Sequence, residues 1–203
     1  MRELNKGDEI TSFRDFVENE NPVNWDDFHA RGKEVFEDSR FHILSEEQSY
    51  CCGYTEIYVD DLIDCHIDHY KKKSQFPALE FDWNNFIVAT KDNEFGANHK
   101  DSVYKIQQNE YNSILNPVTD DANRFFKYTE WGEIEANTEN LTEQEIEKAN
   151  KTIEVFNLKH KSLTERRKDV INIVNSMTGQ FTLTELKQHL SSSGFVSVIE
   201  QYG

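Results

Sequence analysis

The residues with the clearest chemical potential stand at the end of an alternating stretch, IDCHIDHY, which three lysines follow at once. Its last acid and last histidine are Asp68 and His69. Histidine suits the role of general base because its pKa lies near neutrality. A carboxylate suits Mg²⁺ or Mn²⁺ because hard cations prefer oxygen ligands. The pair therefore has the residue types of a site that hydrolyses phosphodiesters, with His69 activating water and Asp68 as the first metal ligand.

An asparagine further along the chain is the third candidate. In FDWNNFIVAT, Asn84 and Asn85 come directly before an apolar run. An amide side chain adds no charge, and it can orient an imidazole by hydrogen bonding to the backbone of the intervening loop. We expect Asn85, or its neighbour Asn84, to orient His69 in this way.

The lysine triplet, Lys71, Lys72 and Lys73, admits two interpretations. Most charge runs are solvated surface loops. Placed directly after the candidate base, in a chain of formal net charge -16, the triplet would also supply positive charge where a nucleic-acid backbone enters. Both interpretations stay open at this point.

A β-hairpin is needed to bring these side chains together. The segments CCGYTEIYVDD and LIDCHIDHY, residues 51–70, contain β-branched and aromatic residues with partial alternation, which predicts a short hairpin. On a strand over 62–69, Asp68 would face one way and His69 the other. The lysines would lie in a loop, WNNFIVAT would form a second short strand or an apolar anchor, and a helix would begin near Asn93 or a little later.

Helical patterns precede this centre. The spacing of phenylalanine and valine predicts a short helix over 11–20, capped by Thr11. Residues 22–48 are mostly helical in pattern, with a break expected at Gly32.

A second hairpin and further helices follow it. Residues 124–136 predict a hairpin with Trp131–Gly132 near its turn. Three helices come next, each opened by a capping-box pair, namely Thr142 with Glu145, Ser162 with Glu165, and Thr182 with Glu185.

The predicted elements give an α+β fold with helix in excess of strand. We expect an N-terminal helical segment (1–48), a core that carries the site (49–115), and a hairpin with C-terminal helices (116–203). These three parts would pack as one compact domain.

Composition limits the classes of function. Apolar residues make up 36% of the 203 residues, enough for a core. No apolar run approaches the roughly 20 residues of a membrane span, and the first residues lack the apolar centre of a signal peptide. The three cysteines do not form the even set that a disulfide framework needs. We therefore expect a cytoplasmic protein without membrane contact. The acidity disfavours free-standing nucleic-acid binding unless positive charge is concentrated at one site or supplied by a partner.

The order of strand, Asp-His, loop, Asn and helix resembles that of the HNH, or ββα-metal, endonucleases. The resemblance implies a ββα-metal HNH core embedded in a mostly helical chain, with one catalytic Mg²⁺ or Mn²⁺. It places the further metal ligands at the start of the helix, among Asn93, Glu94, Asn98 and His99.

A closer resemblance covers most of the chain. Segments occur in the same order as in the HNH subunit of Septu-type and retron-linked anti-phage systems, namely ILSEEQSYCCGYTE, IDHYKKKSQFP, FDWNNF, ILNP, FFKYTEWGEI, KTIEVFNLKHKSLTERRK and FVSVIEQYG. This resemblance implies an ABC-like (SMC-type) ATPase as partner and DNA or tRNA as substrate. It leaves open whether a retron reverse transcriptase with its RNA–DNA hybrid takes part.

The chain departs from this pattern at the cysteines. Relatives often carry two cysteine pairs that hold a structural zinc, but here only Cys52 stands at such a position, and Thr55, Thr90 and Asn93 replace the others. We therefore expect no structural zinc. Two functions follow: a metal-dependent nuclease subunit, or a catalytically weak or inactive HNH-like adaptor that binds the ATPase.

Overall fold

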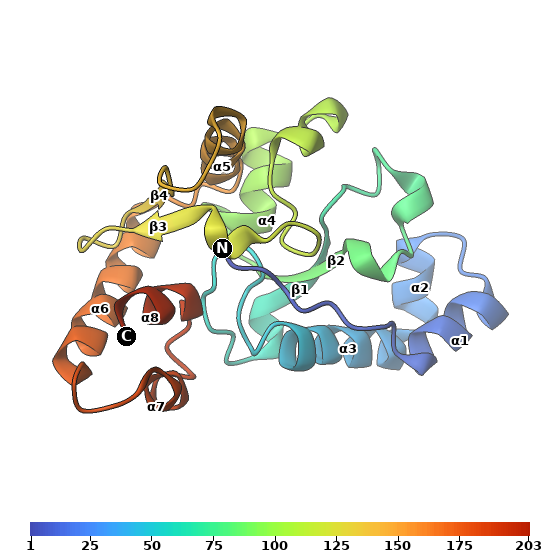
Figure 1. Cartoon of the computed structure of the whole chain (residues 1–203). Coiled ribbons are helices and arrows are strands. Elements are labelled where there is room, and N and C mark those ends of the chain that lie inside the picture. The colour runs from blue at the N-terminus through green and yellow to red at the C-terminus, as the bar shows by residue number, and fades with distance from the viewer.

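Two short antiparallel strands form a hairpin in the middle of the molecule, in a computed structural model that describes residues 1–203. Strand β1 (Cys65–His69) pairs with β2 (Phe86–Thr90), so that His69 lies opposite Phe86. Helices lie on both sides of the hairpin (Figure 1). The predicted α+β class with helix in excess is therefore confirmed.

The first strand is shorter than the prediction of 62–69. Residues Leu62–Asp64 form a 3₁₀ turn instead, because the Asp61 side chain accepts a hydrogen bond from Ile63 N and caps it. The hairpin predicted over residues 51–70 is wrong. Residues 50–58 contribute only an isolated bridge between Cys51 and Tyr58, and β1 pairs with β2 instead.

A side chain takes the place of a third strand beside β2. The Gln48 amide accepts a hydrogen bond from Val88 N (2.8 Å) and donates to Val88 O (2.8 Å) and Cys51 O (2.8 Å). Buried backbone N–H and C=O groups without a hydrogen-bond partner cost free energy. The Gln48 amide supplies partners to the edge of β2, so that a segment other than a strand can cover this edge.

The N-terminal helices cover the face of the hairpin that carries His69. They are α1 (Thr11–Glu20), α2 (Trp25–Arg31) and α3 (Lys33–His42). Their aromatic residues join those of the hairpin in one buried cluster, which includes Phe13, Phe28, Phe36, Trp83 and Phe86. The aromatic edge-to-face contacts among these rings fix the helices against the strands.

The predicted break at Gly32 is confirmed, since α2 ends and α3 begins on either side of it. The predicted cap at Thr11 is wrong. Ile10 precedes the first helical residue, and no side chain caps this end.

A short helix follows β2 and packs beside it. This helix, α4 (Gly96–Asn98), continues as a π-helical turn through Tyr104. The prediction of a helix starting near Asn93 or later is confirmed, with the start at Gly96. The backbone of Gly96 has φ +71, which glycine adopts without strain.

The second hairpin consists of β3 (Phe126–Tyr128) and β4 (Ile134–Ala136), as predicted. Gly132 lies in its turn with φ +82°, and a Cβ there would collide with the backbone of the later helix α6 (Lys161–Met177). Only glycine therefore allows this turn to approach the helix so closely.

Four helices complete the chain. They are α5 (Glu143–Val155), α6 (Lys161–Met177), α7 (Leu183–His189) and α8 (Val196–Tyr202). The predicted capping boxes at the starts of α5 and α7 are confirmed. The one predicted at Ser162 is wrong, because α6 already begins after His160 and has no side-chain cap. Helix α8 has no counterpart among the predicted elements.

A larger buried cluster joins the centre of the chain to these C-terminal helices, since residues from 52 to 199 contribute to it. All three cysteines are buried. None of the helices has the length and apolar character that crossing a bilayer demands.

A buried carboxylate attaches α8 to the centre of the molecule. Glu56 accepts hydrogen bonds from Ser197 N (2.9 Å) and Ser197 Oγ (2.6 Å), and it lies 2.9 Å from the amino group of Met1. Burial alone would raise the pKa of Glu56, but the amino group and Ser197 lower it to about 2.

Replacing this carboxylate should destabilise the fold. We expect Glu56→Gln to lower the free energy of unfolding by about 3 kcal/mol, because a buried charge pair loses one partner. The contribution of Glu56 is fully present above its ordinary pKa of 4.5 and is lost as the pH falls toward 2. Urea unfolding of both proteins at neutral and acidic pH measures this. The exposed Glu139→Gln is the control, and an equal effect of the two substitutions would contradict the assignment.

Candidate functional site

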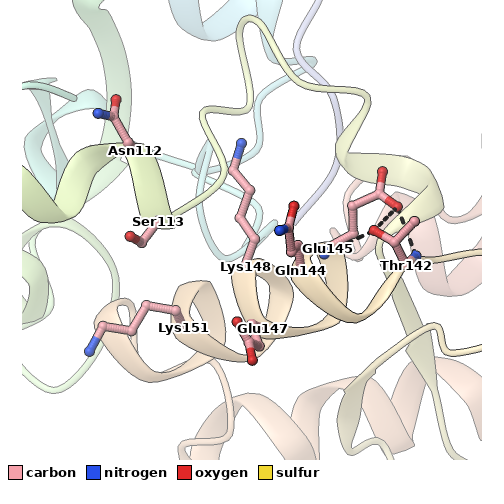
Figure 2. A pocket seen from close by; sticks show the side chains of 8 residues that line it. All are labelled: Asn112, Ser113, Thr142, Gln144, Glu145, Glu147, Lys148 and Lys151. Carbon is pink, nitrogen blue, oxygen red and sulfur yellow. Dashed lines mark hydrogen bonds between the residues drawn. The ribbon is translucent and has the colours of Figure 1, made fainter.

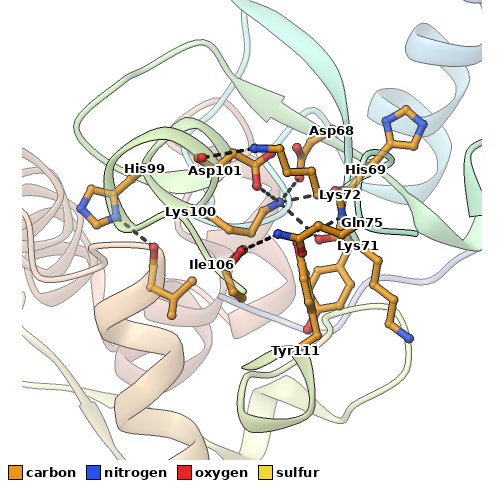
Figure 3. Close-up of polar contacts among 12 residues, drawn as sticks. Asp68, His69, Lys71, Lys72, Gln75, His99, Lys100, Asp101, Ile106 and Tyr111 are labelled. Carbon is orange, nitrogen blue, oxygen red and sulfur yellow. Dashed lines mark hydrogen bonds and ion pairs between the residues drawn. The ribbon is translucent and has the colours of Figure 1, made fainter. Parts of the chain in front are cut away.

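Asp68 and His69 occupy the last two positions of β1, and both are largely buried. Their side chains point to opposite faces of the hairpin, as the alternation predicts. Figure 3 shows the His69 ring turned away from the contacts that Asp68 makes. The two candidate residues therefore lie in two different environments and do not form one hydrogen-bonded pair.

The imidazole of His69 is held by the backbone of the loop between the strands. Its Nε2 lies 2.9 Å from the carbonyl oxygen of Glu80. A carbonyl oxygen only accepts hydrogen bonds, so we assign the proton of the neutral ring to Nε2. Nδ1 then carries the lone pair, has no hydrogen-bond partner in the chain and is not sealed from solvent. This nitrogen is free to act as a base.

Aromatic rings fix the plane of the imidazole. The centroid of the Trp25 ring lies 4.6 Å from that of His69 in an edge-to-face arrangement, and the Phe86 ring lies at 5.2 Å. Burial among these rings lowers the pKa of His69, although the Glu80 carbonyl and Asp68 act in the opposite direction. The ring is therefore neutral near pH 7.

The loop that supplies the Glu80 carbonyl is itself held by Asn85. The Asn85 amide accepts a hydrogen bond from Lys71 N (2.8 Å) and donates to Lys71 O (3.0 Å) and Leu79 O (3.1 Å). These contacts join the two ends of the loop. Asn85 is buried and Asn84 is exposed, so only Asn85 acts on the position of His69.

Asp68 lies on the other face in a network of polar contacts. Its carboxylate accepts a hydrogen bond from the Tyr54 hydroxyl (2.5 Å) and lies 3.4 Å from the ammonium of Lys100. Lys100 is completely buried and also contacts Asp101 Oδ1 at 2.8 Å. Burial lowers the pKa of Lys100, but the two carboxylates outweigh it and raise the pKa above its ordinary value. The lysine is therefore charged. Figure 3 shows its contacts with the two carboxylates.

The residues expected to complete a metal site lie apart from this network. His99 donates from Nδ1 to Val155 O (2.9 Å), and the Glu94 carboxylate is exposed beside His160 (3.5 Å). Asn93 pairs with Asn98 through their side-chain amides. No group of three or more His, Cys, Asp or Glu side chains is arranged to hold a metal ion. The expected ligands therefore do not fit a divalent ion in this arrangement.

The three lysines of the loop have different contacts. Lys72 Nζ donates to Asp101 O (3.3 Å), and its backbone N–H donates to the Tyr111 hydroxyl (3.1 Å). Lys73 lies 3.5 Å from the carboxylate of Asp26, and Lys71 lies over the ring of Phe76. All three are partly exposed, so their contact with nucleic acid stays a prediction.

Sequence reasoning missed the residues that surround Asp68, namely Tyr54, Lys100 and Asp101. Lys100 and Asp101 follow directly after His99 in the predicted helix, but nothing in their spacing marks them as neighbours of Asp68. Adjacent positions do not face each other on an ordinary α-helix. The π-helical turn over His99–Tyr104 nevertheless places both side chains against the hairpin.

A second candidate for a site is a polar depression of about 770 Å³ on α5 (Figure 2). Only polar and charged residues line it, and its lysines are paired: Lys148 with Asp120, and Lys151 with Glu110 and Glu154. Neither Asp68 nor His69 lines it. The chemically distinctive residues are therefore those of the β1–β2 hairpin.

Comparison with known proteins adds no assignment. Neither a protein-family model nor a curated protein matches this chain.

His69 should remain neutral at pH 7 with its proton on Nε2. ¹⁵N NMR of the ring should show this tautomer and a pKa below the ordinary 6.5. Because the unfolded chain then binds the proton more readily, the contribution of His69 to stability is present above pH 6.5 and is lost as the pH falls. Urea unfolding on either side of this pH should therefore show a larger loss for wild type than for His69→Gln. An equal loss would argue against the buried neutral ring.

Asn85→Asp should loosen the loop. The new carboxylate would face the carbonyls of Lys71 and Leu79, which leaves buried polar groups unpaired and costs about 2 kcal/mol. We expect faster tryptic cleavage at the loop lysines and a lower urea midpoint. Asn84→Asp makes the same chemical change at the exposed neighbouring position. It should change neither the rate of tryptic cleavage nor the urea midpoint by much. Similar behaviour of both variants would show that Asn85 does not hold the loop.

Proposed function

We propose that this chain is the nuclease subunit of an HNH-type system and that His69 is its general base. The observation that carries the proposal is the hydrogen bond from His69 Nε2 to the Glu80 carbonyl, within a loop that Asn85 closes. This arrangement leaves Nδ1 as a fixed, neutral acceptor. A base of this kind removes a proton from water at neutral pH.

The proposed reaction is the hydrolysis of a phosphodiester. His69 Nδ1 takes a proton from water, the water oxygen forms a bond to phosphorus, and the bond from phosphorus to the leaving sugar oxygen breaks. The leaving oxygen then takes up a proton from a solvent water molecule. Lys71 and Lys73 lie on the loop beside His69 and would offset the charge of the bound phosphate. No step is assigned to a metal ion, because the expected ligands lie apart.

The order of elements supports the same proposal. The hairpin β1–β2 is followed by α4, which packs beside β2, and this is the sequence of elements of a ββα core. The proposed setting is the cytoplasm, with DNA or tRNA as substrate. The acidic chain would depend on an ABC-like ATPase for tight contact with nucleic acid. If the system includes a retron, its reverse transcriptase and RNA–DNA hybrid would be further partners.

A specific observation favours a second candidate function. The Asp68 carboxylate is already neutralised by Lys100 and is buried. An HNH-like chain in which this acid has become structural would serve the ATPase as an adaptor without cleaving nucleic acid itself.

Replacing the proposed base separates the two functions. We expect His69→Ala to lower cleavage of plasmid DNA or total tRNA by about 10²- to 10⁴-fold, because general-base catalysis contributes that much. The chain is assayed together with the ATPase, with and without Mg²⁺ or Mn²⁺. His66→Ala, three residues earlier on the same strand, is the matched control.

Full activity of folded His69→Ala would refute the base assignment. Absence of cleavage by wild type, combined with tight binding to the ATPase, would instead support the adaptor.

A further inference from the structure

We propose that the Lys100 ammonium is the resident cation between Asp68 and Asp101, so that the wild-type chain binds no divalent ion at these carboxylates. The inference concerns the cation requirement of the site proposed above. It does not need the chain to be a nuclease, because binding rather than cleavage tests it.

The surroundings of the ammonium are those of a bound cation. Besides Asp68 and Asp101, the Lys100 Nζ contacts the carbonyl oxygens of Tyr70 (3.2 Å) and His69 (3.4 Å). Two carboxylates and two carbonyls thus point at one positive centre. Oxygen donors of these kinds are the ligands that hard cations take in proteins.

The size of this oxygen cage fits an ammonium. The distances from Nζ run from 2.8 Å to Asp101 to 3.4 Å to Asp68. Those values lie at and somewhat beyond the normal range of N–H···O hydrogen bonds. Mg²⁺ requires about 2.0–2.1 Å and Ca²⁺ about 2.3–2.6 Å, so either ion would need the oxygens to move inward.

Charge balance requires a cation at this place. The carboxylates of Asp68 and Asp101 both lie against the Lys100 ammonium, and Asp68 also accepts a hydrogen bond from the Tyr54 hydroxyl. Asp101 lies 2.8 Å and Asp68 3.4 Å from the ammonium nitrogen, and two like charges this close to one centre repel each other. Without a positive charge between them, one of the acids would have to be protonated.

The lysine cannot leave this place easily. Its side chain has no exposed surface, and its backbone carbonyl accepts a hydrogen bond from Ile106 N (3.1 Å) at the end of the π-helical turn. Withdrawal of the ammonium would leave the buried Asp68 and the half-buried Asp101 without a cation, and removing the partner of a buried charge costs several kcal/mol. A divalent ion in solution would have to offset this cost in order to replace it.

Mn²⁺ binding to the full chain tests the proposal. Electron paramagnetic resonance of free Mn²⁺ would be compared for wild type, Asp68→Asn, Lys100→Met and the Lys100→Met, Asp68→Asn double variant. We expect wild type and Asp68→Asn to bind alike. We expect Lys100→Met to gain one Mn²⁺, which the double variant binds at least about tenfold more weakly, as loss of a supporting carboxylate typically causes. Lys161→Met, at an exposed lysine, is the control and should gain nothing.

Two results would overturn the proposal. One is an Mn²⁺ ion in wild type that Asp68→Asn removes. The other is folded Lys100→Met without an Asp68-dependent ion.

A second measurement applies if Lys100→Met fails to fold. ¹⁵N NMR of the wild-type lysine side chains should show one slowly exchanging ammonium, unchanged by added Mg²⁺ and lost in Asp68→Asn. An ammonium signal that Mg²⁺ displaces, or the absence of any protected ammonium, would contradict the assignment.

Discussion

The buried ammonium of Lys100 is the contact on which the arrangement of the site depends. It connects the helical turn after β2 to the end of β1, through Asp68 and the carbonyls of His69 and Tyr70. Burying these charges is costly, and their mutual attraction offsets the cost only when every partner is present. The position of the helix, the end of the strand and the start of the lysine loop are therefore coupled through one charged group.

The hairpin separates two kinds of environment within the thickness of one strand pair. On one face Asp68 lies among charges and hydroxyls, and on the other His69 lies among aromatic rings. The period of two along a strand makes this division unavoidable for adjacent residues. As a result the acid and the base have different principal partners: Lys100 sets the charge around Asp68, while burial is the largest influence on the protonation of His69, ahead of the Glu80 carbonyl and Asp68.

The sequence predicted those features that depend on neighbouring residues, such as strand alternation and helix caps. The alternation along the strand correctly predicted that the His69 and Asp68 side chains lie on opposite faces of the hairpin. The Thr142 and Thr182 capping boxes marked two helix starts correctly. The prediction of a cap at Ser162 was wrong because α6 begins at Lys161, directly after His160, so that Ser162 already lies in the first turn of the helix. The pairing of Lys100 with Asp68 joins residues that are far apart in the chain, and its π-helical geometry leaves no periodic signal. Such a contact cannot be predicted from spacing.

The two functions proposed for the chain differ in how they use the same ion pair. In a nuclease, Asp68 would be needed for its charge, and Lys100 would hold that charge at a fixed place beside the strand that carries His69. In an adaptor, the pair would serve only to join the helix to the hairpin, and any neutral pair of equal shape would do as well, as replacements of buried ion pairs by apolar groups have shown in general. The two uses also differ at His69. A nuclease would use the unpaired Nδ1 as its base, whereas an adaptor would need only the contacts that Glu80 and the aromatic rings make with the imidazole.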